Sequence, residues 1–255
     1  MQIKAFLDFK GHAYVCVIDM EELVICCMNR RLNDFLEDKY GGAFVVRNAG
    51  ANVAPLMPLI KQAVREKGID TITLVTHDDC GAMGKTFAVI KKGAEATDEL
   101  KDELINQFKA VKFETRNQLE EKNTELQLSA LKREFPNITV QAKPAKMSDI
   151  KVPEDNKEHK LLVLGPGKPE YSKIFKGLEL MHSQCYIVQA PIYNAMPDIE
   201  LAVKELHAKE VFFVVSDKDN PRDVKRDADT ASLKLTRLGA EVKRYDTRTV
   251  RKSFA

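Results

Sequence analysis

Three side chains of the types that bind zinc follow two short β-branched runs of this sequence. Cys27 closes the run over residues 23–27, and His77 and Cys80 directly follow the run over residues 71–76. Thiolate sulfur and imidazole nitrogen are the ligands that Zn²⁺ prefers in proteins. A lone His-x-x-Cys pair is weak on its own, so the chemistry depends on whether Cys27 lies near that pair in the fold.

The surrounding pattern predicts how these residues are positioned. Strands are expected over residues 23–27, 43–46 and 71–76, with helices near residues 32–38 and from Pro55 onward between them. This alternation is typical of an α/β fold with a mostly parallel sheet. In an open sheet of order 2-1-3-4, the first and third strands are neighbours, and ligands bind beyond their carboxyl ends. The three side chains are therefore expected to converge, with a fourth position left for water, as in catalytic zinc sites.

The chain beyond residue 96 divides into a charged stretch and a second set of strands. Residues 97–135 predict a helix with one apolar stripe, which Pro136 ends, and residues 138–140 predict a fourth strand. Residues 143–160 are typical of a linker or surface loop. Three more strands are expected, at residues 161–164, 186–188 and 211–215.

The second half resembles the first at a nearly constant spacing. Ile60 matches Ile199 and Val75 matches Val214 at an offset of 139 residues, and the first and second strands match at offsets of 138 and 142. Near-constant offsets indicate a tandem duplication, although any two α/β units share a strand-helix rhythm. We expect two similar units, each a mostly parallel β-sheet flanked by helices, over residues 1–150 and 151–255, packed as an intramolecular pseudo-dimer.

The second unit is expected to be a degenerate copy without metal ligands. Gly165 stands where Cys27 stood, and Ser216 and Asp219 replace His77 and Cys80 at the offset of 139 residues. Such a unit could still wall the site of the first unit.

Three segments in order give the chain a resemblance to a known family. Residues 27–31 (CMNRR), 46–50 (VRNAG) and 77–81 (HDDCG) look like the Cys-x-Asp-x-Arg, Arg-Asn-Ala-Gly and His-x-x-Cys-Gly segments of the β-class carbonic anhydrases. The resemblance covers roughly residues 20 to 142. It implies a Cys-His-Cys zinc site in an α/β sheet fold, completed by a dimer partner. It also implies reversible hydration of carbon dioxide to bicarbonate by zinc-bound hydroxide.

The register of the first motif depends on two adjacent cysteines. With Cys27 as the zinc ligand, Arg31 falls on the arginine of the motif and Asn29 on its aspartate. The alternative, Cys26, would place Met28 at the aspartate. Because side chains alternate along a strand, only one thiol can face the metal, and Cys27 is the better fit.

Asn29 is the departure from the family pattern. The family aspartate pairs with the arginine and accepts a hydrogen bond from the zinc-bound hydroxide, whereas asparagine is neutral and a poor zinc ligand. We therefore expect an open site in which Asn29 and Arg31 act with weakened or lost activity, and Arg31 lacks its usual partner and can hold bicarbonate. Asp78 and Asp79 are expected in turn and helix-cap roles. The alternatives are a non-catalytic zinc-binding homologue, or a hydrolase of carbonyl sulfide or carbon disulfide.

Composition narrows the class of protein further. Lys plus Arg is 40 and Asp plus Glu is 38, so a net charge of +2 gives no electrostatic case for binding nucleic acid or membrane surfaces. The sequence shows neither a signal-peptide pattern nor a run of about 18 apolar residues. Five cysteines, an odd number, argue against a disulfide framework. We expect a cytoplasmic enzyme with a small-molecule substrate, with room for a homo-oligomer of pseudo-dimers.

Overall fold

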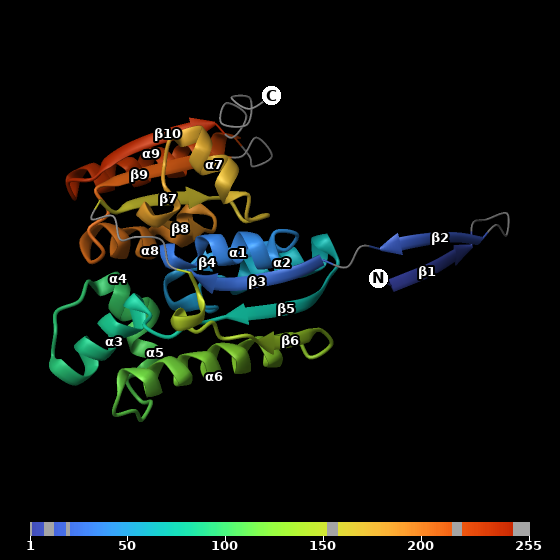
Figure 1. Cartoon of the computed structure of the whole chain (residues 1–255), viewed down its shortest axis with the longest axis horizontal. Helices are drawn as coiled ribbons and strands as arrows, with labels where there is room; N and C mark the ends of the chain where they lie inside the picture. The colour runs from blue at the N-terminus through green and yellow to red at the C-terminus, as the bar shows by residue number, and fades with distance from the viewer. Residues whose placement is uncertain (1, 8–12, 19–20, 152–157, 216–220, 247–255) are drawn as a thin grey trace.

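The computed structural model describes residues 2–7, 13–18, 21–151, 158–215 and 221–246 (Figure 1). Eight of its strands form one sheet of order β10-β9-β7-β8-β4-β3-β5-β6, and β1 and β2 form a separate antiparallel hairpin that projects from the body. The strands are β1 (Gln2–Leu7), β2 (Ala13–Ile18), β3 (Glu21–Cys27), β4 (Phe44–Asn48), β5 (Ile69–Val75), β6 (Thr139–Ala142), β7 (Lys160–Leu164), β8 (Cys185–Gln189), β9 (Glu210–Val215) and β10 (Glu241–Asp246).

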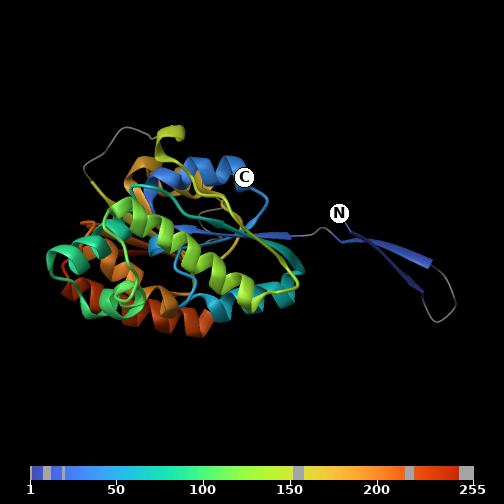
Figure 2. The same ribbon diagram turned by 90° about the horizontal axis from the view of Figure 1, so that it is seen from below.

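Helices cover both faces of this sheet (Figure 2). They are α1 (Asn33–Tyr40), α2 (Met57–Lys67), α3 (Gly81–Lys92), α4 (Asp98–Leu100), a π-helical turn (Lys101–Ile105), α5 (Asn106–Phe108), α6 (Arg116–Glu134), α7 (Tyr171–Leu178), α8 (Ile192–Lys204) and α9 (Pro221–Arg237). Helices α1 and α7 lie on one face, and α2 and α9 lie on the other. None of the described helices is long and apolar enough to cross a membrane.

The sheet consists of two parallel sets that meet in the middle. The first set has the order β4-β3-β5-β6, and the second has the order β8-β7-β9-β10. All pairings within each set are parallel, and β4 meets β8 in an antiparallel pairing at Arg47 and Gln189. The predicted α/β class and the 2-1-3-4 order of the first strands are confirmed. The two sets make one continuous sheet over one hydrophobic core, which holds Ile72 and Val211 alike.

Some predicted elements are wrong or incomplete. Residues 97–135 do not form one helix, because the chain leaves the helical path after α5 and resumes it only at α6. Phe113 in this break is buried, and Thr115 caps α6 by accepting a hydrogen bond from the Gln118 backbone N–H. This capping box starts a new helix where the charge pattern alone shows no interruption. Helix α3, the hairpin and β10 were not predicted.

One buried cation joins the first unit to the second. The Arg47 side chain is 0% exposed, and it donates to the carbonyls of Cys27 at 3.1 Å and Asn29 at 2.9 Å and to Asn33 Oδ1 at 2.8 Å. Its guanidinium lies 5.2 Å from the centroid of the Tyr171 ring, which belongs to α7. These contacts hold the chain that follows β3, because each accepting group would otherwise be buried without a donor.

Replacing this cation by a neutral side chain of similar volume should therefore destabilise the fold. Arg47→Met leaves three acceptors unpaired, and we expect the free energy of unfolding to fall by about 3 kcal/mol. Urea unfolding followed by circular dichroism measures the change. Arg237→Met, at an exposed position on α9, is the matched control and should stay within about 0.5 kcal/mol of the parent protein. Equal stability of the two variants would contradict the role given to Arg47.

Candidate metal centre

The carboxyl ends of β3 and β5 bring the predicted metal ligands together. These strands are hydrogen-bonded neighbours, with Cys26 opposite Val75. Cys27 is the last residue of β3, and His77 and Cys80 lie in the loop between β5 and α3. The ligand atoms of all three residues are buried within 4.8 Å of one another, although the residues are far apart in the sequence.

The geometry of the three groups fits a zinc ion. Two sulfurs held at 2.3 Å by a tetrahedral zinc lie about 3.8 Å apart, and Cys27 Sγ and Cys80 Sγ are separated by 3.8 Å. His77 Nδ1–H donates to the Asp78 carbonyl at 2.7 Å, which leaves Nε2 as the atom with the free lone pair. Nε2 is buried and has no hydrogen-bond partner among the described residues. An orphaned nitrogen beside two thiols is the donor set of a zinc site.

The electrostatics of the cluster favour an ionised thiol at Cys27. A hydrogen bond from the Cys80 thiol, aided by nearby His77, holds the pKa of Cys27 well below its usual range. The same contact raises the pKa of Cys80 well above its usual range. Burial opposes a charge on His77, but the Cys27 thiolate outweighs it and raises the pKa of the imidazole. Metal binding would therefore displace protons from this cluster.

Cys26, the alternative ligand, lies outside the cluster. Adjacent residues of a strand face opposite sides, and Cys26 is buried on the side of Arg47. Burial raises the pKa of the Cys26 thiol to about 12. A thiol that does not ionise near neutral pH is a poor metal ligand.

The carboxylate of Glu120 on α6 holds the loop that carries Cys80. It accepts the backbone N–H of Cys80 at 2.8 Å and that of Asp79 at 3.2 Å. The same carboxylate accepts Arg116 Nε at 3.0 Å, one turn earlier on α6. Glu120 is buried, so these contacts replace the water that its charge has lost. The loop conformation thus depends on a helix that begins more than thirty residues later in the chain.

Arg31 has a partner, contrary to the prediction. Its Nη1 donates to Asp79 Oδ2 at 2.8 Å and its Nη2 to the Asp79 carbonyl at 2.7 Å. Its Nε donates to Asn29 Oδ1 at 3.3 Å. Asp79 is not a helix cap either: the N-cap position of α3 is Cys80, and the Asp79 carboxylate also meets Arg116 Nη2 at 2.9 Å. Partial burial opposes it, but Arg31 and then Arg116 lower the pKa of Asp79.

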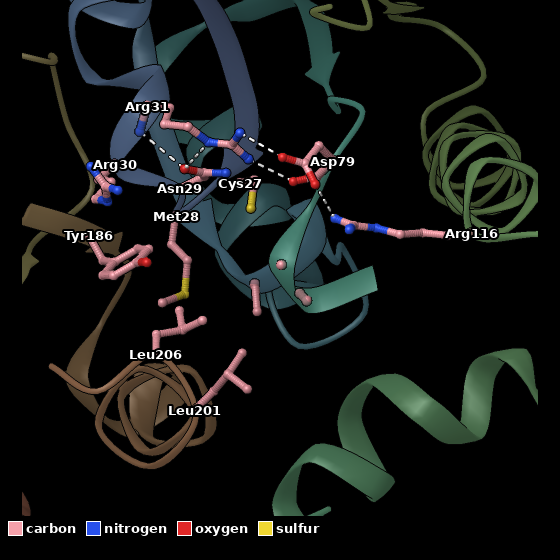
Figure 3. Close-up of a pocket in the computed structure, with 13 residues that line it drawn as sticks. Cys27, Met28, Asn29, Arg30, Arg31, Asp79, Arg116, Tyr186, Leu201 and Leu206 are labelled. Atoms are coloured by element: carbon pink, nitrogen blue, oxygen red, sulfur yellow. Dashed lines mark hydrogen bonds and ion pairs between the residues drawn. The ribbon is translucent and has the colours of Figure 1, made fainter. Parts of the chain in front are cut away.

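A pocket of about 420 Å³ opens beside Cys27 (Figure 3). Its polar side carries Asn29, Arg31, Asp79 and Arg116 from the first half of the chain, and its apolar side includes Met28 together with Tyr186, Leu201 and Leu206, which come from β8 and from α8 and the loop after it. The second half therefore walls a pocket that the metal cluster adjoins.

Sequence patterns missed part of this surrounding. Arg116 and Glu120 carry an i, i+4 spacing that any exposed charged helix shows, so the pattern predicted a solvated face. Asp78 accepts the Met147 backbone N–H at 2.6 Å, which ties the supposed linker to the metal loop. Ser216 and Asp219, expected opposite the lost ligands of the second unit, lie outside the described residues.

Removing each of the adjacent thiols separates the two registers. Cys27→Ala should lose bound zinc, because the cluster keeps only one thiolate and one imidazole. Cys26→Ala should retain zinc at the level of the parent protein. Metal content after gel filtration, measured by plasma mass spectrometry, gives the answer, and zinc lost only from Cys26→Ala would reverse the assignment.

The contact of Glu120 with the metal loop predicts an effect on metal affinity. Glu120→Gln leaves one oxygen where two now accept, and we expect zinc affinity to fall about 10- to 100-fold, as for other groups that orient metal ligands. Competition with a chromophoric chelator measures it. Glu121→Gln changes an exposed neighbour on the same helix and should leave affinity unchanged; a similar loss in both variants would argue against the role of Glu120.

Comparison with known proteins places this chain in a family. The family model described as carbonic anhydrase matches residues 22–165, more than half of the chain. A tetrameric β-carbonic anhydrase of Sordaria macrospora is 20% identical over 53% of this chain and 80% of that chain, with a TM-score of 0.40. The carbonic anhydrase of Streptococcus mutans is 20% identical over 59% of this chain and 90% of that chain, with a TM-score of 0.37. No curated protein sequence matches the chain.

The matched residues begin in β3 and end just after β7, so they contain Cys27, His77 and Cys80 in a single span. On the extent of this match, the chain belongs to the β-carbonic anhydrase family.

Proposed function

We propose that the protein is a zinc-dependent carbonic anhydrase that hydrates carbon dioxide reversibly to bicarbonate. The observation that carries this proposal is the buried triad of Cys27, His77 and Cys80, with its orphaned Nε2, beside an accessible pocket in a member of this family. These three residues would hold the metal. A zinc ion bound there would lower the pKa of a water molecule enough to make a nucleophile near neutral pH.

The residues around the triad bind and orient the small reactants. Arg31 keeps a second N–H on each Nη group, and these face an anion such as bicarbonate with two donors. Asn29 Oδ1 is committed to the Arg31 N–H groups, so the amide nitrogen, which only donates, takes the other side (Figure 3). The pocket therefore lacks the acceptor that the family aspartate supplies, and hydration is slow.

The apolar side of the pocket suits carbon dioxide. Met28, Leu201 and Leu206 offer no hydrogen bonds, so they receive a nonpolar linear molecule and hold less ordered water. Bicarbonate, once formed, is better bound on the polar side.

We propose further that residues 1–150 and 151–255 are duplicated units packed as a pseudo-dimer. The pairing registers support this, since Leu23 lies opposite Phe44 and Ile72, and Leu161 lies opposite Tyr186 and Val211. These equivalences have the offsets of 138, 142 and 139 residues that the sequence match has. Helices α1 and α7 are each 8 residues long at the same offset.

The junction between the units also has the form of a two-fold contact. The Ile187 N–H donates to the Met28 carbonyl at 3.0 Å, and the Val45 N–H donates to the Gly167 carbonyl at 2.9 Å. In each bond a second strand of one unit meets the segment after the first strand of the other. The second unit then takes the place of the dimer partner that the family resemblance implies.

The same proposal covers partners and location. The substrate is a small molecule, nucleic acid and membrane are not partners, and the pseudo-dimers can associate into a homo-oligomer in the cytoplasm. The S. macrospora relative is tetrameric.

A second candidate is a zinc-binding homologue without hydration activity. The observation in its favour is the orientation of Asn29, whose oxygen is occupied by Arg31. A hydrolase of carbonyl sulfide or carbon disulfide uses the same apolar wall. Metal analysis together with stopped-flow hydration of carbon dioxide separates these: zinc with hydration supports the enzyme, zinc without it supports the alternatives, and protein without metal contradicts all of them.

Restoring the family carboxylate gives a direct test of the slow rate. Asn29→Asp adds an acceptor at the pocket, and we expect kcat for hydration to rise about 10²-fold, the usual contribution of a positioned acid–base group. Stopped-flow assays with a pH indicator measure this at equal zinc content. Asn106→Asp, at an exposed position on α5, is the control. If the rate of Asn29→Asp does not rise, the missing carboxylate is not what limits the parent protein.

A further inference from the structure

Asn29 gives Arg31 only a weak tether. Its Oδ1 accepts the Arg31 backbone N–H at 3.1 Å and Nε at 3.3 Å. Charge-assisted bonds between arginine and a carboxylate are shorter, at about 2.7–2.9 Å. The neutral amide therefore leaves the outer end of the guanidinium to be fixed by another group.

Asp79 supplies the short contacts. Its carboxylate and its own carbonyl accept from the two Nη groups at 2.8 and 2.7 Å. Two contacts from one residue to neighbouring nitrogens fix the plane of the guanidinium as well as its position. Arg31 thus points along the rim of the pocket with its remaining N–H groups available to a ligand (Figure 3).

The backbone of Asp79 is held in an unusual conformation to make these contacts. Its φ is +49°, in the left-handed region that residues other than glycine rarely adopt. Glu120 accepts the Asp79 N–H, and Arg116 binds the second carboxylate oxygen. Two cations and two anions alternate along this chain of contacts, so the charges balance. Strain of this kind persists where the surroundings determine it, and it gathers at functional sites.

We propose that Asp79 has taken over from position 29 the task of holding Arg31, and is a positioning residue for anion binding at this pocket. The inference rests on the proposed function for its ligand, which is bicarbonate. It does not rest on turnover, because anion binding can be measured directly. Arg116 supports Asp79 from α6.

The sign of one substitution separates this role from simple electrostatics. Asp79→Asn removes the charge but keeps a residue that tolerates positive φ. If Asp79 positions Arg31, bicarbonate affinity falls about 10- to 100-fold. If Asp79 acts only as a negative charge beside the pocket, its removal strengthens anion binding.

The measurement uses the full-length protein loaded with cobalt, whose visible absorption reports bicarbonate binding. Asp79→Asn should weaken bicarbonate binding at unchanged cobalt content. Arg31→Gln should weaken it as well, and adding Asp79→Asn to Arg31→Gln should cause no further loss. Asp229→Asn removes an exposed carboxylate that pairs with Arg244 far from the pocket, and should change nothing.

Each other outcome overturns the inference. Unchanged or tighter binding in Asp79→Asn, additive losses in the double variant, or loss of cobalt from Asp79→Asn assigns Asp79 a different role. If Asp79→Asn does not fold, Arg116→Gln takes its place and should weaken bicarbonate binding in the same direction. A parent protein that takes up cobalt but binds no bicarbonate removes the ligand and so sinks the idea.

The proposed function is judged separately by stopped-flow hydration. Weakened bicarbonate binding in a protein that does not hydrate carbon dioxide supports the inference and contradicts the proposed enzyme. Measurable hydration together with unchanged binding in Asp79→Asn contradicts the inference alone.

Discussion

A single buried guanidinium governs how this chain turns from its first parallel strand into its metal centre. Arg47 is fully buried, and its hydrogen bonds go to two backbone carbonyls and one amide oxygen in the segment after β3. A charge in such a place needs every acceptor that surrounds it, so the segment cannot relax without losing them. The face of Tyr171 covers the cation from the second half. The same interaction therefore holds the backbone of Cys27 and brings the two halves of the sheet together.

The metal centre follows from this arrangement. Parallel strands β3 and β5 end side by side, which places Cys27 against the loop of His77 and Cys80. Glu120 holds that loop from the opposite side through two backbone N–H groups. The centre is thus fixed by hydrogen bonds to the main chain, and its ligand side chains are left with nothing to bind except each other and a metal.

The replacement of an acidic residue by Asn29 changes the charge pattern of the pocket without removing the arginine. An aspartate at this position would accept hydrogen bonds and balance Arg31 directly. Asparagine does only the first, and its single oxygen is used by Arg31. The balancing charge lies instead on Asp79, which Arg116 shares. The site keeps its cation in place while the direction in which hydrogen bonds are offered to a ligand is altered.

The sequence alone determined the local features of this protein. Motif spacing singled out the residues that cluster, and β-branched runs located the strands, because both signals are contained in a few neighbouring residues. Spacing even anticipated the pairing registers of the second half, since strands that match in sequence pair alike. Tertiary structure alone decided which partner Arg31 takes, which residues of α6 hold the metal loop, and which side chains of α8 wall the pocket. These depend on distances between segments far apart in the chain, and a charged residue such as Asp79 or Arg116 carries no local mark of the partner that packing will bring to it.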